Sequence, residues 1–240
     1  MNHNFNGLVI EDRHTATQPL HLQNLQVTGD CYFMETVEAD RIDITGTAQF
    51  REFATCDRLW ISGEACFKQN LLAETIQVPG DLTVLGRCWS DVAVFEHKGN
   101  IQGAFSAGRL LVKGSGTLEA TQKLKGDRVT IQGQLLANEQ VNCQELEILS
   151  CFPSRIHELN SDRVTVRYVT PPGQLEMTCT SPLLTVTFMD VSEANLTYTH
   201  VEELFCDSAV IGKGCYIREL IYRKGIEIDS GAVVERLLKA

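Results

Sequence analysis

A five-residue pattern ending in glycine repeats four times near the start of the chain: LQVTG (25–29), IDITG (42–46), LWISG (59–63) and IQVPG (76–80). The closing glycines are 17 residues apart in each step. A fixed short period is the sequence signature of a repeat architecture, in which stacked units share one core. This repeat therefore decides the fold class.

The same frame continues beyond residue 80. It passes through His97 and Gly114, and after a two-residue insertion it resumes from Gly116 to Gly133 and Ser150. The position two before the glycine is apolar in every row: Val27, Ile44, Ile61, Val78, Phe95, Val112, Ile131 and Ile148. The position ten after it is small: Ala39, Cys56, Ala73, Ser90, Ala107, Gly126 and Cys143. The repeat therefore spans more than half of the chain.

Apolar and polar residues alternate within each unit, as in the segment RIDIT (41–45). A period of two is typical of half-buried strands. We expect about three strands of three to four residues in each unit, with the glycine as a turn residue at positive φ. One unit cannot bury its apolar face alone, so units must stack. The sequence predicts an all-β parallel β-solenoid with 17 residues per winding and a triangular cross-section.

The regularity of the repeat divides the chain into three parts. We expect an N-terminal tail or cap in residues 1–19, a regular solenoid in residues 20–152, and a less regular continuation with a C-terminal cap in residues 153–240. Four of the six prolines lie between positions 153 and 182, and PPG (171–173) predicts a turn. A break near 155–182 into two solenoid blocks is the alternative.

Composition excludes several classes of protein. Asp and Glu number 31 against 21 Lys and Arg, a net charge of −10, which argues against binding to nucleic acid or to anionic membranes. No apolar run is long enough for a transmembrane helix, and residues 1–11 lack the pattern of a signal peptide. The nine cysteines include no Cys-x-x-Cys pair. They predict reduced, mostly buried thiols in a cytosolic protein, with only Cys66 accessible.

No catalytic, cofactor-binding or metal-binding residues can be assigned. None of the six histidines has a Cys or carboxylate partner at a metal-like spacing, and His97 is expected to be exposed. A left-handed β-helix acyltransferase is one alternative, and VIGKGC (210–215) matches one unit of its hexapeptide repeat. Such repeats need 18 residues per winding, whereas this chain has 17. The other alternative is a monomeric binding module.

The ends of a solenoid present unpaired strand edges and a cross-section of the apolar core, so they must be capped or stacked on another chain. The apolar residues expected at the N-terminal end are Leu20, Leu22, Leu25 and Val27. Those expected at the C-terminal end are Ile226, Ile228, Val233, Val234 and Leu237. We take these nine residues as a candidate polymerisation interface.

The repeated glycine-to-glycine pattern and the closing segments 201–204, 209–215 and 226–229 resemble those of the bactofilins, which are polymer-forming cytoskeletal proteins. The resemblance covers roughly residues 20–238. It implies a right-handed β-helix that polymerises end to end without nucleotide and scaffolds other proteins in cell shape, envelope growth or motility. The implied partners are other copies of the chain, a paralogous bactofilin and client proteins. The implied location is the cytoplasm, with membrane association only through partners.

Overall fold

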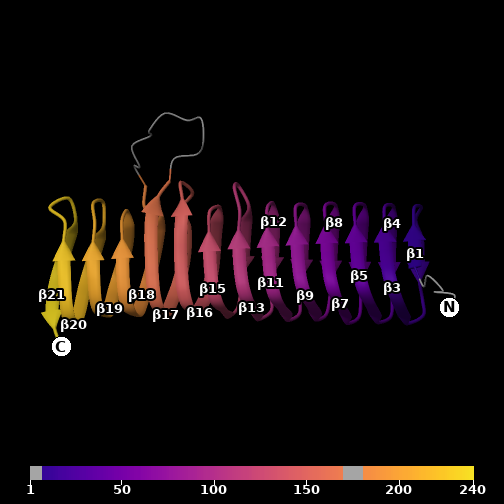
Figure 1. Cartoon of the computed structure of the whole chain (residues 1–240), viewed down its shortest axis with the longest axis horizontal. Helices are drawn as coiled ribbons and strands as arrows, with labels where there is room; N and C mark the ends of the chain where they lie inside the picture. The colour runs from indigo at the N-terminus through magenta and orange to yellow at the C-terminus, as the bar shows by residue number, and fades with distance from the viewer. Residues whose placement is uncertain (1–6, 170–180) are drawn as a thin grey trace, which may run out of the picture.

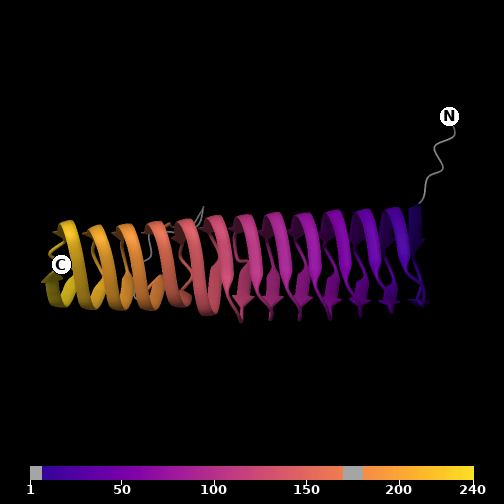
Figure 2. The ribbon, with the colours of Figure 1, turned by 90° about the horizontal axis from the view of Figure 1, so that it is seen from below.

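Backbone pairing joins all strands into a single stack of parallel windings. The computed structural model describes residues 7–169 and 181–240. About 13 windings follow one another from the N-terminal to the C-terminal end (Figure 1). Seen from below, the stack is a slender rod (Figure 2). At the usual strand spacing of about 4.8 Å it is about 60 Å long. The predicted parallel β-solenoid is confirmed, and the described residues contain no helix.

Most windings before residue 134 contain one long and one short strand. The eight-residue strands are β3 (Leu20–Val27), β5 (Val37–Ile44), β7 (Ala54–Ile61), β9 (Leu71–Val78), β11 (Cys88–Phe95), β13 (Phe105–Val112) and β15 (Leu124–Ile131). The four-residue strands that follow them are β4 (Asp30–Phe33), β6 (Thr47–Phe50), β8 (Glu64–Phe67), β10 (Asp81–Val84), β12 (Lys98–Ile101) and β14 (Thr117–Ala120). Each strand pairs in parallel with its equivalent in the next winding.

Each regular winding has three sides, and each side points two side chains inward. In the winding that starts at β5, the inward pairs are Val37 and Ala39, Ile42 and Ile44, and Ala48 and Phe50. The first and second sides belong to one continuous strand, whose ladder skips Asp40 at the corner between them. The three predicted strands therefore correspond to three sides, of which the first two are joined.

The inward side chains form columns that run along the stack. The rings of Phe33, Phe50 and Phe67 are stacked, with centroid distances of 4.5 and 4.3 Å. Phe95 lies in a different column from this stack, and its ring has room because the next strand, β12, places Gly99 beside it. A Cβ at Gly99 would lie 2.5 Å from the Phe95 ring. A large side chain in one column is thus matched by the smallest residue in the neighbouring column, which keeps the core filled.

The repeated glycines have a different role from the one predicted. Positive φ occurs only at Gly114, Gly214 and Tyr198 among the described residues. The repeat glycines instead allow close backbone approach at the corner between the second and third sides. A Cβ at Gly63 would lie 2.1 Å from the carbonyl oxygen of Gly46 in the preceding winding. Of the glycines in the repeat frame, Gly114 has the predicted positive φ, at 55°. At the others the expectation of left-handed turns was wrong, because what requires glycine there is contact between windings.

The solenoid begins before residue 20. Within the predicted N-terminal tail or cap, β1 (Gly7–Ile10) pairs with β3, and β2 (His14–Ala16) pairs with β4. These two strands supply the second and third sides of an additional winding.

The strands after residue 133 are longer and their windings vary. They are β16 (Gln134–Ser150), β17 (Ser154–Tyr168), β18 (Leu184–Leu196), β19 (Thr199–Ile211), β20 (Tyr216–Ile228) and β21 (Val233–Lys239). The pairing Met189↔Leu204 defines a winding of 15 residues, and Leu204↔Leu220 one of 16. The ladder between β17 and β18 is continuous, with 11 paired residues, so the stack does not divide into two blocks. The turn predicted at residues 171–173 lies outside the described residues.

Candidate interaction surfaces

At the N-terminal end, the structure separates the four predicted interface residues into two pairs. Leu25 and Val27 are buried, because β1 lies directly over them with Leu8 and Ile10 as their ladder partners. These two residues belong to the core, so their assignment to an end surface was wrong. Leu20 and Leu22 on the first side are partly buried.

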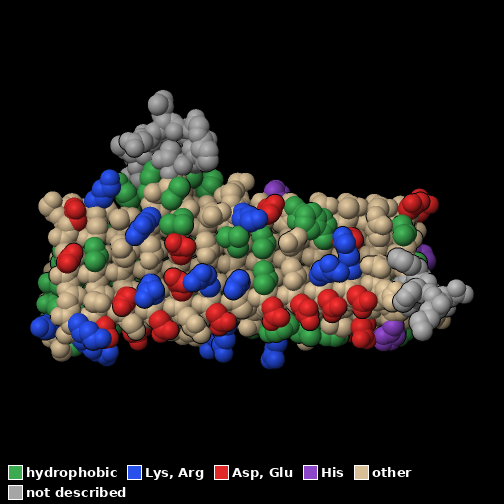
Figure 3. Space-filling view, in the orientation of Figure 1, with side chains coloured by type: hydrophobic (Ala, Val, Ile, Leu, Met, Phe, Trp, Pro, Cys, Tyr) green, Lys and Arg blue, Asp and Glu red, His purple; other side chains and the backbone are tan. Residues whose placement is uncertain are grey.

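At the C-terminal end, all five predicted residues lie in the last winding. Ile228, Val233 and Leu237 are 41%, 53% and 45% exposed. Ile226 and Val234 are partly buried against the core. Hydrophobic side chains are visible at this end in the space-filling view (Figure 3). Ile228 and Leu237 thus continue columns that are buried in the preceding winding at Ile211 and Leu220, whereas Val233 projects outward as the ladder partner of Tyr216.

The backbone of this last winding is also open on one face. Strand β21 pairs with β20, and the segment Ile226–Ile228 of β20 pairs with β19. Within the described part of the chain, no further strand covers either of them. Unpaired N–H and C=O groups in a strand edge are a template for pairing with another chain. The C-terminal end thus offers both hydrogen bonds and apolar area.

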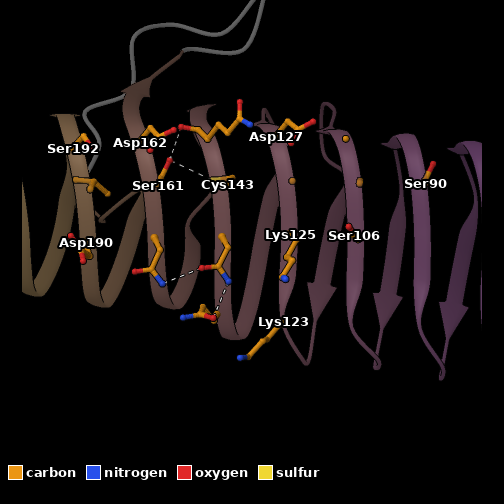
Figure 4. Close-up of a pocket in the computed structure, with 18 of the residues that line it drawn as sticks. Ser90, Ser106, Lys123, Lys125, Asp127, Cys143, Ser161, Asp162, Asp190 and Ser192 are labelled. Carbon is orange, nitrogen blue, oxygen red and sulfur yellow. Dashed lines mark hydrogen bonds between the residues drawn. The ribbon is translucent and has the colours of Figure 1, made fainter.

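A polar groove runs along the first side of the later windings, between Trp89 and Arg223, and its volume is about 1140 Å³. Figure 4 shows Asp127 and Asp162 along one edge and Lys123 at the other. The floor is shaped by the column of small inward residues, which includes Gly126, Cys143 and Ser161. This hollow follows from the small residues that the repeat places there.

The middle of the groove is lined by polar side chains that form hydrogen bonds to one another. Asn142 donates to Gln140 (2.9 Å), and Asn160 donates to both Asn142 (3.1 Å) and Glu158 (3.2 Å). Gln140 in turn donates to Glu158 at 2.5 Å. Because these groups satisfy one another, the network fixes the shape of the floor. At the far end, Asp207 accepts a hydrogen bond from Lys224, which lowers the pKa of its carboxyl group.

The thiols of the described residues are mostly inert. Burial raises the pKa of Cys31, Cys143 and Cys206 to about 11 and that of Cys56 to about 12, and it raises the pKa of Cys88 and Cys215 as well. Since the thiolate is the reactive form, these groups are poor nucleophiles. Cys66 is partly exposed as predicted, but Cys143 and Cys151 are too. Cys179 lies outside the described residues.

Two of the histidines, His21 and His97, pair with carboxylates on adjacent windings. His97 is exposed, as predicted, and its Nδ1 lies 2.6 Å from an oxygen of Asp81. His21 is paired with Glu38 at 3.0 Å. In residues 7–169 and 181–240, no group of three or more His, Cys, Asp or Glu side chains has a geometry suited to a metal ion. Nor does any helix there have the length and apolarity to cross a bilayer.

One surface was not singled out from the sequence. Asp40, Asp57, Glu74 and Asp91 lie one per winding along the corner between the first and second sides, and we call them the acidic edge. Beside this edge, Leu72 and Trp89 point outward from the first side as ladder partners, 41% and 40% exposed. The signal was available in the 17-residue frame, which places these acids in one column once outward positions are aligned.

Comparison with known proteins found no matching family model, no matching curated protein and no matching solved structure. The resemblance to bactofilins therefore stays a prediction from sequence.

Proposed function

We propose that this protein is a non-enzymatic scaffold of the bactofilin type, which assembles end to end without nucleotide and organises partner proteins in the cytoplasm. The observation that carries the proposal is the open C-terminal winding. Its apolar side chains and unpaired strand edge occur together. Ile228 and Leu237 are exposed although they continue columns whose preceding members, Ile211 and Leu220, are buried, and Val233 adds an exposed apolar side chain on the outward side of β21.

Stacking a second solenoid on this end would continue the existing pattern. Each winding already pairs with the next in parallel, and burying apolar area stabilises the contact by about 25 cal/mol per Å². A contact between two different ends repeats without closing and gives a filament, whereas a contact between like ends gives a closed dimer. The rod shape of the subunit suits either arrangement, and the proposal is the filament.

Negative-stain electron microscopy of the purified protein, without nucleotide and over a range of salt, tests the proposal. We expect filaments, and more of them in sulfate salts, which strengthen apolar association. Uniform small particles under all conditions would overturn the proposal.

Single substitutions then locate the contact. Ile228→Arg and Leu237→Arg should give monomers of unchanged thermal stability, because a charge in an apolar contact is costly. The matched control is Val210→Arg, since Val210 is 43% exposed but lies on a lateral side, one winding away from Ile228. It should assemble like the unmodified protein. Equal loss of assembly in both sets, or in neither, would contradict a contact through the C-terminal end.

A further inference from the structure

The first side of the early windings combines exposed apolar side chains with unpaired negative charge. We infer that this surface docks a basic segment of a partner protein, one that carries Lys or Arg together with an apolar anchor. The surface consists of Leu72, Trp89 and the acidic edge. It is distinct from the C-terminal end, and the inference does not depend on end-to-end assembly.

The apolar part of the surface has the composition of an interaction hot spot. Leu72 and Trp89 are ladder partners, so their side chains project from neighbouring windings about 4.8 Å apart. Tryptophan is among the residues that contribute most at protein interfaces. It also binds cations over its ring face. An anchor residue and a flanking cation are thus both accommodated here.

The acidic edge supplies the charge complement. Its four carboxylates follow one another along the stack, and none of them has an ion pair among the described residues. Arg41 and Arg58 directly follow Asp40 and Asp57 in the chain but form no ion pair with them. Arg41 pairs with Asp43 on the second side, and Arg58 has no ion pair with the edge. Like charges in a row repel, and an extended cationic segment along the row would relieve that repulsion.

Two further features bear on the choice of occupant. A hollow of about 220 Å³ continues the surface toward the N-terminus, and Glu38, Asp40 and Asp57 line it. In the other direction, Gly108 interrupts the column of acids after Asp91, and the polar groove mixes Lys123 and Lys125 with Asp127 and Asp162, so the uniformly acidic stretch is confined to the earlier windings. A second copy of the chain is a poor occupant, because each copy carries a net charge of −10.

Figure 3 shows the arrangement from one face. A row of acidic side chains runs along the lower part of the N-terminal half, and hydrophobic side chains lie next to it. For a partner that binds such a surface, the opposite charges increase the association rate constant, and the apolar contacts provide most of the binding free energy.

Fluorescence titration tests the inference on the full chain. The protein has two tryptophans, so a Trp60→Phe background leaves Trp89 as the reporter. The probe is a short amidated peptide of alternating lysine and leucine, compared with a peptide of alternating glutamate and leucine and with one of lysine alone. We expect the Trp89 signal to change with the first peptide, and affinities at least about tenfold weaker for the other two. No change in the Trp89 signal with the first peptide overturns the inference.

Charge variants separate a defined site from general attraction. Asp57→Asn/Glu74→Gln/Asp91→Asn should weaken binding of the lysine–leucine peptide about tenfold or more. The matched control Asp30→Asn/Glu64→Gln/Asp81→Asn removes three charges from a column at the start of the third side, in the same part of the stack. It should weaken binding less than about threefold. Equal weakening by the two triple variants would mean attraction by net charge alone and would overturn the site.

A second experiment tests the contribution of the apolar side chain of Trp89 to binding. Trp89→Ala, measured by calorimetry with the same peptide, should weaken binding about tenfold. The control Trp60→Ala removes a tryptophan that is 41% exposed on the second side and should leave binding unchanged. If Trp89→Ala instead alters only the association of the protein with itself, the surface is a contact between copies and the inference fails.

Discussion

The early and late windings hold the same core with corners of different length. In the winding that starts at Val37, two residues occupy the first corner and three occupy each of the other two. In the 15-residue winding that starts at Met189, each of the three corners has two residues. Both windings point six side chains inward. The cross-section is therefore set by the inward pairs, and corner length is free to vary around it.

The corner between the second and third sides has three residues in the early windings and two in the 15-residue winding, and the two regions form this turn with different residues. The early windings use glycine at the corner between the second and third sides, because a Cβ at Gly46 or Gly63 would collide with the backbone of the preceding winding. The 15-residue winding uses Thr197 and Tyr198, and Tyr198 adopts a φ of 48°. A left-handed conformation costs a non-glycine residue about 1–2 kcal/mol. A shorter corner is thus obtained at the expense of local strain.

The largest effect should come from breaking the aromatic column of the early windings. Phe50→Ala removes the central ring of the stack formed with Phe33 and Phe67. We expect the free energy of unfolding to fall by about 3–5 kcal/mol, because a cavity replaces the ring. Chemical denaturation measures the loss, and hydrogen exchange should place it in the early windings. Unchanged stability would show that the column does not hold these windings together.

A glycine substitution in each region compares the two kinds of corner directly. Gly63→Ala places a methyl group against the backbone of the preceding winding and should cost about 2–3 kcal/mol. Gly225→Ala is the control, because nothing lies within 4 Å of the added carbon. It should be neutral or stabilising by about 0.4–1 kcal/mol. Equal destabilisation at both positions in thermal unfolding would refute close approach as the reason for the repeat glycines.

A double-mutant cycle tests whether the Phe95 ring occupies the space that Gly99 leaves free in the neighbouring column. Gly99→Ala should cost about 1–3 kcal/mol, since the methyl group meets the Phe95 ring. Combining it with Phe95→Leu should recover part of that loss, with a coupling energy of about 0.5–3 kcal/mol. Additive losses in denaturation experiments would mean that the two positions do not share space.

The smallest effect concerns an exposed ion pair of the late windings. Asp207 accepts a hydrogen bond from Lys224 at 2.8 Å, and Arg223 lies 3.4 Å away, which lowers the pKa of Asp207 from its usual 3.8. The stabilisation is present above pH 3.8 and is lost as the pH falls through the lower pKa of the folded state. Stability curves of the unmodified protein and of Asp207→Asn should therefore converge in acid. Lys224→Gln should reproduce the loss seen above pH 3.8, and a constant difference at all pH values would rule out the pair as its cause.

Much of the candidate interface followed from the sequence, and the part that did not has a physical cause. The C-terminal residues were predicted because apolar residues recur up to residue 237, and the structure exposes Ile228, Val233 and Leu237 among them. Leu25 and Val27 were misplaced because residues 1–19 were expected to form only a tail or cap, whereas β1 pairs directly with the strand that carries both residues and continues their columns. Leu72, Trp89 and the acidic edge were overlooked because single exposed side chains are common on strands and become informative only when neighbouring windings align them.

The sequence by itself determined the parallel solenoid, the 17-residue period and the inward columns, since the alternation of apolar and polar residues and their stacking are properties of the repeat. Only the tertiary structure decided why glycine recurs, where the first winding begins and which outward side chains lie together. These depend on contacts between one winding and the next, and a contact between residues 17 apart in the chain exists only once the register of the ladder is set.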